Sequence, residues 1–431
     1  TTIAGTPSST IITRFNVPRS ITVVLPVLVA PFRALLGFKS DTYRSAIGWK
    51  RIPYLWFGSL WQMGGLAVMP MALLVLSGDQ AVGPTWAGEV LAALSFLMAG
   101  LGLHMTQTAG LALASDRATD ETRPRVVALL YVMFLIGMGV SAIVVGALLR
   151  DFSDLRLVQV VQGVALVTIL LNLVALWKQE RVRPMSKEER AAPRPTFRDA
   201  WADYASGGDA GRLLVVVFMG TMAFNMQDVL LEPYGGEVLG LSVSATTALT
   251  ALWAAGALIG FAFAARWLRR GLSPYRMCSR GILWGITAFS LVIFSAPLNM
   301  PALFFAGAAG IGLGGGLFAV ATLTAAMTLP KGERAGQGLA LGAWGAAQAT
   351  AAGLAIALGG TIRDGVNALS DAGLLSEALT NSATGYSVVY HLEIGLLFAT
   401  LIAVGPLVRL SFFQPQPNRG ASKIGLADFP T

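Results

Sequence analysis

Cysteine and histidine are scarce in this chain: its 431 residues include one Cys and two His. A single cysteine cannot form an intramolecular disulfide, and so few thiols and imidazoles cannot supply the ligands of a metal cluster. The sequence also lacks an HExxH pair, a Walker phosphate loop and a Ser–His–Asp set. We therefore expect no enzymatic active site, and we expect Cys278 to serve in packing.

Charged residues are also rare, at 13% of the chain, whereas 55% of its residues are hydrophobic. A soluble domain carries about a quarter charged residues, so this composition indicates a membrane protein. The net charge of +8 does not indicate nucleic-acid binding, because the basic residues lie in short loops between apolar runs. Residues 1–10 are polar and do not have the basic-then-apolar pattern of a cleavable signal peptide.

Eleven apolar runs are long enough, at about 20 residues, to cross a bilayer as helices. They lie at residues 20–37, 53–77, 86–114, 124–149, 156–177, 212–231, 243–268, 275–297, 301–329, 335–360 and 385–410. Residues 1–19 contain a weaker apolar stretch, which we interpret as the end of an incomplete first span. The sequence predicts an all-α membrane protein with two six-helix halves, at 1–177 and 212–410, joined by a basic linker at 178–211 and followed by a tail at 411–431.

The Lys and Arg residues divide unevenly between alternate loops. The side that carries the linker holds 25 of them, and the opposite side holds five. By the positive-inside rule, the linker and the C-terminal tail are predicted to be cytoplasmic. A short surface helix is expected in the linker, around Phe197 to Tyr204.

The loop between the predicted second and third spans reads GFKSDTYRSAIGWKRIPY. It resembles the signature loop of the major facilitator superfamily, with extra residues before the basic pair. Glycines allow a tight turn to approach neighbouring helices, and an acidic side chain can accept from basic groups or from a helix N-terminus. The resemblance implies a major facilitator fold and a conformational role for six residues: Gly37, Asp41, Arg44, Gly48, Lys50 and Arg51.

Four further blocks resemble the PucC/LhaA family of purple phototrophic bacteria, and the similarity runs from about residue 5 to residue 410. The blocks are LPVLVAPFRALLGFKSD, HMTQTAGLALASD, MQDVLLEPYGGEVLGLSV and LALGAWGAAQATAAGLAIALGGTIRDG. The resemblance implies an inner (intracytoplasmic) membrane protein that assembles a light-harvesting antenna and handles bacteriochlorophyll. It also implies antenna polypeptides as partners, with the reaction centre–antenna core and chlorophyll synthase as further candidates. Core and peripheral antenna remain equally open.

Polar side chains inside the apolar runs are candidate ligand contacts, since such groups are costly in lipid. His104 and Gln107 lie one turn apart, and a neutral imidazole could ligate the magnesium of the pigment. A structural hydrogen bond is the simpler account of His104. Asn225, Asp228 and Glu232 are expected to share one helix face, with Gln227 beside it. Asp228 is a candidate proton-titrating group, and a structural role is the alternative.

Three more features in the predicted spans invite an interpretation. Trp344 and Gln348 lie on a glycine-rich face that can line a cavity or contact a partner. Arg33 has three options: pairing with Asp228, binding a propionate or phosphate, or snorkelling to the headgroups, which we favour. The glycine-rich run at 307–319 lies in an apolar span and is not followed by the lysine of a phosphate loop, so it predicts close helix packing or a flat approach to a pigment ring.

Three functions remain open from the sequence. The first is an antenna assembly factor that binds or delivers bacteriochlorophyll. The second is a proton-coupled transporter of a small molecule or tetrapyrrole, with its substrate near the membrane midplane. The third is a membrane scaffold for photosynthetic complexes that transports nothing.

Overall fold

The structure is a computed structural model. It describes residues 28–77, 85–151, 153–191, 193–206, 208–329, 336–376, 379, 381 and 383–413. The incomplete span expected within residues 1–19 lies outside the described residues, and the run at 20–37 is described only from residue 28. The other ten predicted runs are helical, with a 3₁₀ turn inside the run at 212–231, and nine helices in the described part are long and apolar enough to cross a membrane.

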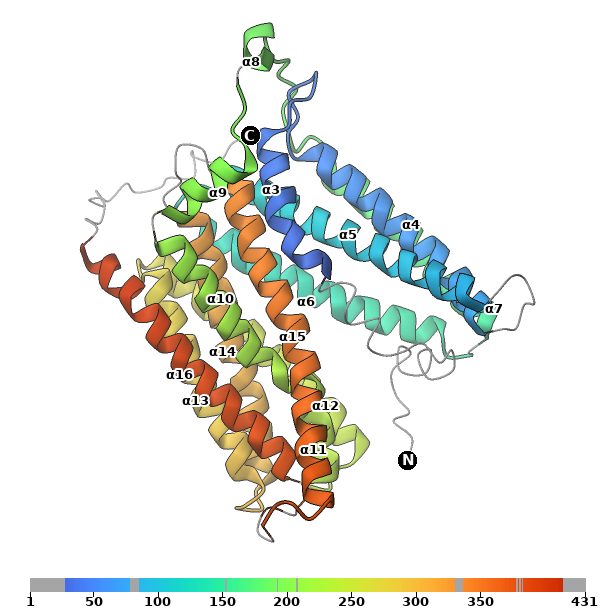
Figure 1. Cartoon of the computed structure of the whole chain (residues 1–431), viewed down its shortest axis with the longest axis vertical. Helices are drawn as coiled ribbons and strands as arrows, with labels where there is room; N and C mark the ends of the chain where they lie inside the picture. Colours follow the sequence, from blue (N-terminus) through green and yellow to red (C-terminus); the bar gives the residue numbers. More distant parts are fainter. Residues whose placement is uncertain are drawn as a thin grey trace, which may run out of the picture.

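The chain is divided into two helical halves by a linker, as Figure 1 shows. The first half contains η1 (Ala30–Phe32), α3 (Arg33–Thr42), α4 (Ile52–Ser77), α5 (Thr85–Arg117), α6 (Arg123–Leu148) and α7 (Asp154–Leu176). The linker carries α8 (Lys187–Ala191) and α9 (Phe197–Ser206), and α9 matches the predicted surface helix. The second half contains α10 (Asp209–Asn225), η2 (Met226–Val229), α11 (Leu231–Glu237), α12 (Val243–Arg269), α13 (Pro274–Ser295), α14 (Pro301–Thr328), α15 (Gln337–Asp371) and α16 (Thr384–Phe413).

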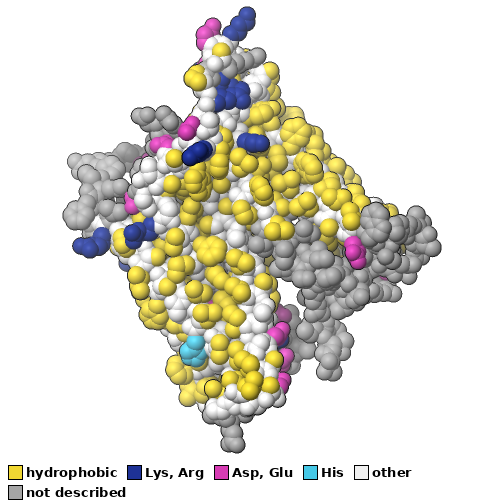
Figure 2. Space-filling model, in the orientation of Figure 1, with side chains coloured by type: hydrophobic (Ala, Val, Ile, Leu, Met, Phe, Trp, Pro, Cys, Tyr) yellow, Lys and Arg dark blue, Asp and Glu magenta, His cyan; other side chains and the backbone are white. Residues whose placement is uncertain are grey.

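The two halves meet at one end and diverge toward the other. At the end that carries α8 and α9, here called the linker end, α3 lies against α15 (Figure 1). From there α4 to α7 run away from the second half, and the opposite end is here called the far end (Figure 1). Basic side chains gather toward the linker end, whereas the visible helix faces below them are broadly hydrophobic (Figure 2). This is the surface of a protein whose helices lie in lipid.

Glycines set the close packing of the second half. A Cβ on Gly256 or Gly312 would clash with a backbone carbonyl oxygen of the facing helix, at Ala309 and Trp253 respectively. A Cβ on Gly314 would lie 2.8 Å from the carbonyl oxygen of Gly281. The backbone of helix α14 therefore lies almost in contact with the backbones of α12 and α13. This confirms the close helix packing predicted for the run at 307–319. Small residues provide this approach in lipid, where apolar burial does not drive helix association.

The predicted span at residues 212–231 is broken. Helix α10 ends at Asn225, a 3₁₀ turn covers Met226–Val229, and α11 follows. A proline commonly ends or kinks a helix, but Pro233 lies inside α11 and the break precedes it. Helix α15 passes close by, because a Cβ on Gly359 would lie 2.7 Å from the carbonyl oxygen of Met226.

Candidate binding site between the halves

Helices α3 and α15 cross at backbone contact and close the linker end. A Cβ on Gly37 would clash with the carbonyl oxygen of Gly338, and one on Gly338 would lie 2.5 Å from the carbonyl oxygen of Gly37. One turn further along α15, a Cβ on Gly342 would clash with the carbonyl oxygen of Arg33. The three glycines therefore allow the two halves to meet without an intervening side-chain layer.

Asp41 joins the halves at this crossing. Its carboxylate accepts from the backbone N–H groups of Gly338 at 2.9 Å and of Leu339 at 2.8 Å, which are at the start of α15. A carboxylate at a helix N-terminus satisfies otherwise unpaired N–H groups and interacts favourably with the helix dipole. Arg51 donates to Asp41 at 2.5 Å and to Asp116 at 3.1 Å. Burial lowers the pKa of Arg51, but the two carboxylates outweigh that effect and raise it above its ordinary value.

The rest of the predicted conformational loop packs against the linker. Gly48 has φ +84°, and a Cβ there would clash with the carbonyl oxygen of Arg183. Glu180 of the linker accepts from the backbone N–H groups of Lys50 and Arg51. Arg44 and Lys50 line a small surface pocket beside Asp41. The structure thus brings five of the six loop residues, Gly37 excepted, close to the linker or to the Arg51 ion pair.

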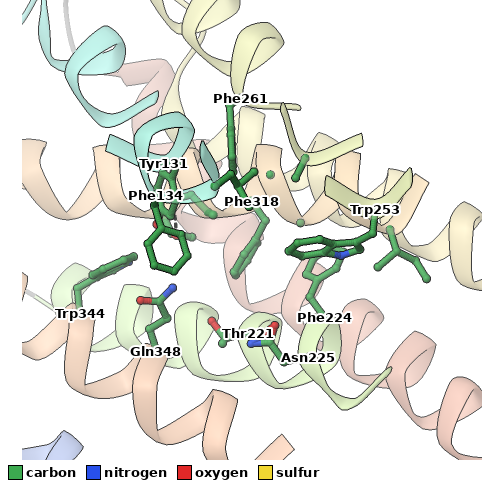
Figure 3. Close-up of a pocket in the computed structure, with 17 residues that line it drawn as sticks. Tyr131, Phe134, Thr221, Phe224, Asn225, Trp253, Phe261, Phe318, Trp344 and Gln348 are labelled. Carbon is green, nitrogen blue, oxygen red and sulfur yellow. Dashed lines mark hydrogen bonds between the residues drawn. The ribbon is translucent and has the colours of Figure 1, made fainter. Parts of the chain in front are cut away.

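Two neighbouring cavities lie between the halves beyond this crossing. One has a volume of about 240 Å³ and the other of about 310 Å³. Four residues line both cavities: Tyr131 and Phe134 from α6, and Trp344 and Gln348 from α15. In Figure 3 the side chains of Tyr131 and Phe134 face Trp344, Gln348 and other side chains of the second half across the cavity. Phe134 is 58% exposed, so the cavities reach the surface past this ring.

The smaller cavity has a largely aromatic wall (Figure 3). Phe224, Trp253, Phe261 and Phe318 from the second half contribute to it, together with the amide of Asn225. Tyr131 stacks on Phe261 with ring centroids 5.2 Å apart, which joins α6 to α12. Aromatic faces with a few polar side chains are typical of sites for flat apolar ligands.

The larger cavity is lined by Arg33 and by two hydrogen-bond donors without a described partner. Arg33 is 3% exposed, so our expectation that it snorkels to the headgroups is wrong. Its Nε donates to the Thr108 hydroxyl at 3.2 Å. The Trp344 indole N–H and the Tyr131 hydroxyl are buried, and neither has a hydrogen-bond partner among the described residues. Buried polar groups are normally paired, so each of these donors calls for a partner.

The remaining predicted site residues fall in different places. Gln107 lines the larger cavity, whereas His104, one turn earlier on α5, is buried and lines neither. Gln227 is buried and donates to Asp228 Oδ1 at 2.5 Å. Glu232 accepts from Thr250 at 2.7 Å. Asp228 and Glu232 line neither cavity: Asn225 ends α10, whereas Asp228 lies in the 3₁₀ turn and Glu232 in α11 beyond it.

One buried acid was missed in the sequence. Glu393 of α16 is fully buried, and its carboxyl oxygens accept no well-aligned hydrogen bond from a described residue, although the backbone N–H of Gln227 lies near them. It interacts electrostatically with Asp228 and with Tyr390, whose buried hydroxyl also has no described partner. Its position within the apolar run 385–410 was the available signal, because an ionisable residue inside a span is a candidate for function.

Comparison with known proteins gives the family. The chain matches the family described as PUCC protein over residues 11–412. The chain belongs to the PUCC family. It is 60% identical, over its full length and 90% of the relative, to an uncharacterized protein from the puhA-bchM intergenic region of Rhodobacter capsulatus. It is 50% identical to Protein PucC of Rhodovulum sulfidophilum, over 84% of this chain and 81% of the relative.

A solved structure shows the fold of this PUCC family chain. A bacterial homologue of the iron transporter ferroportin, in an outward-facing state, superposes with a TM-score of 0.67. It is 15% identical, and the match covers 94% of this chain and 91% of that one. A solved structure of a major facilitator superfamily transporter also superposes on this chain. The chain therefore has the major facilitator fold, as the signature loop predicted, and it is a multi-pass membrane protein.

Proposed function

We propose that this chain is an assembly factor for a purple-bacterial light-harvesting antenna, and that it binds bacteriochlorophyll and delivers it to antenna polypeptides. Membership of the PUCC family supports the antenna role. The observation that carries pigment binding is the aromatic wall shared by the two cavities between the halves. The proposal places the chain in the inner, intracytoplasmic membrane with its linker end cytoplasmic, because basic residues concentrate on that side.

The side chains around the cavities suit the edge and face of a chlorin ring. Trp344, Tyr131 and Phe134 offer aromatic surface, and ring pairs of this kind contribute about 0.5–1.5 kcal/mol beyond area burial. The amides of Gln107 and Gln348 and the unpaired Trp344 N–H can donate to ring carbonyl groups. His104 is the side chain that would ligate the magnesium of a bound pigment. His104 lines neither cavity, so ligation requires a movement of α5.

Partner helices would dock on exposed apolar faces of the first half. Residues exposed on α6 and α7 include Met133, Ile143, Leu171 and Val174. Such faces suit single-span antenna polypeptides, and they would equally serve a scaffold for the reaction centre–antenna core or for chlorophyll synthase. The scaffold hypothesis and the assembly-factor proposal therefore use the same docking surface. They differ in that only the assembly factor needs the cavity to bind pigment.

Replacement of Trp344 by alanine tests the proposal. We expect the purified variant to retain roughly one tenth of the near-infrared pigment that co-purifies with the wild type, because the ring and its N–H donor are both lost from the cavity wall. The measurement is pigment absorbance per mole of protein after isolation in mild detergent. Trp177→Ala is the matched control, since Trp177 is 74% exposed. A colourless wild type, together with normal antenna absorbance in a strain lacking the gene, would refute the proposal.

Glu393 favours a second candidate, a proton-coupled transporter. A fully buried carboxyl inside a membrane span can exchange a proton as its surroundings change. In proteoliposomes with an internal pH-sensitive dye and zinc protoporphyrin outside, this function predicts proton uptake coupled to the porphyrin. Glu393→Gln would reduce that uptake at least tenfold, whereas Glu232→Gln would leave it unchanged. Equal uptake by wild type and Glu393→Gln would exclude Glu393 as the coupling group.

A further inference from the structure

The larger cavity presents donors and a positive charge. Arg33, Tyr131 and Trp344 all line it. The bond from Nε to Thr108 is the one hydrogen bond that the Arg33 side chain donates to a described residue, so its other guanidinium N–H groups are left for a ligand. With the Tyr131 hydroxyl and the Trp344 indole N–H, three side chains thus offer hydrogens to one space. A ligand that satisfies them must supply acceptor atoms.

The charge of Arg33 has no partner carboxylate among the described residues, where every ion pair involves another arginine. Asp41, the acid on the same helix, is already engaged by Arg51 and by the N-terminus of α15. Leaving a buried cation uncompensated costs several kcal/mol. An anion in the cavity would remove that cost.

The position of the guanidinium is determined by its neighbours. A Cβ on Gly345 would lie 2.5 Å from Arg33 Cζ, so the planar group lies directly on the α15 backbone at this glycine. The hydroxyl of Thr108 on α5 accepts from Nε and fixes that end of the group. Arg33 is therefore a positioned group at a wall of the cavity, and the fork of an arginine matches the two oxygens of a carboxylate.

We propose that Arg33 binds a carboxylate of the ligand, so that this cavity takes a flat tetrapyrrole with a free propionate in preference to its ester. This inference rests on the proposed pigment-binding function and adds that the form bound here is the unesterified precursor, which becomes the delivered bacteriochlorophyll once it is esterified. The ring would lie against Trp344, Tyr131 and Phe134, with its carboxylate directed to Arg33. The class of reaction that consumes such a ligand on the way to a membrane-anchored pigment is esterification of that carboxylate with a long-chain alcohol.

The test compares a free acid with its ester. Full-length protein in nanodiscs of phosphatidylcholine is titrated with zinc pheophorbide a and with its methyl ester, and binding is followed by quenching of tryptophan fluorescence. We expect the wild type to bind the free acid at least tenfold more tightly than the ester. Arg33→Gln should abolish that preference by weakening the acid alone. Arg150→Gln, at an exposed position in the loop after α6, is the matched control and should keep the preference.

Each other outcome is decisive. Equal affinity for acid and ester in the wild type overturns the inference and leaves pigment binding in place. Failure of the wild type to bind either compound overturns the inference together with the proposed function. Displacement of the acid when phosphatidylglycerol replaces part of the phosphatidylcholine would mean that Arg33 serves a lipid headgroup, which also overturns it. If Arg33→Gln aggregates, the test uses Arg33→Lys together with the comparison of acid and ester in the wild type. Arg33→Lys should then reduce the preference for the free acid over the ester.

Discussion

Replacing Asp41 by asparagine should open the linker end. The change removes the negative charge that Arg51 and the N-terminus of α15 share, while the amide keeps one acceptor oxygen and nearly the same shape. Breaking a buried ion pair by removing one partner costs about 3–5 kcal/mol, and we expect the lower figure here because Asp116 still contacts Arg51. A loss of about 3 kcal/mol shifts the balance between closed and open linker ends by roughly a hundredfold.

The measurement is the distance between two spin labels across the linker end. Glu121, between α5 and α6, and Arg270, after α12, are exposed and belong to different halves. With cysteines at both positions, the variant should show a longer distance that is minor or absent in the wild type. Cys278 is buried and should remain unlabelled. Asp151→Asn, an equal charge change at the far end, is the control, and an unchanged distribution in Asp41→Asn would show that the carboxylate does not hold the halves together.

Gly37→Ala should destabilise the protein more than the addition of a single methyl group usually does. The new methyl group would clash with the backbone of Gly338, so it cannot be accommodated by a side-chain rotation, and α3 must move away from α15. Overpacking of a well-packed contact costs about 1–3 kcal/mol, and a backbone neighbour places this site at the upper end. We expect a clear fall in the midpoint of thermal unfolding in detergent and a broader spin-label distance distribution.

Gly139→Ala on α6 provides the matched comparison. Nothing lies within 4 Å of the Cβ that it would add, so the substitution only removes a helical glycine. A glycine in a helix interior costs about 1 kcal/mol relative to alanine, and the control should therefore be neutral or slightly stabilised. If both variants unfold at the wild-type temperature, the crossing of α3 and α15 is looser than the structure shows.

The cavity residues illustrate where sequence reasoning stopped. The sequence places Trp344 and Gln348 on a glycine-rich face that can line a cavity, and they line both cavities. It does not single out Tyr131 and Phe134, since an aromatic residue that lines a cavity has the same sequence pattern as one that packs against a helix or contacts lipid. Their importance comes from α6 facing α15, which no periodicity within α6 encodes. The sequence also suggested a shared face for Asn225, Asp228 and Glu232, but the 3₁₀ turn at Met226–Val229 separates them.

By itself the sequence determined the helical spans, the basic linker, the loop around Asp41 and Arg51 and the family. Those features depend on local composition, since a run of about 20 apolar residues must form a helix in lipid to satisfy its backbone. Only the tertiary structure decided that Arg33 is buried beside Gly345 and that Glu393 lies near Asp228. Burial and charge pairing are set by contacts between helices that are distant in the chain, and such contacts arise when the two halves meet.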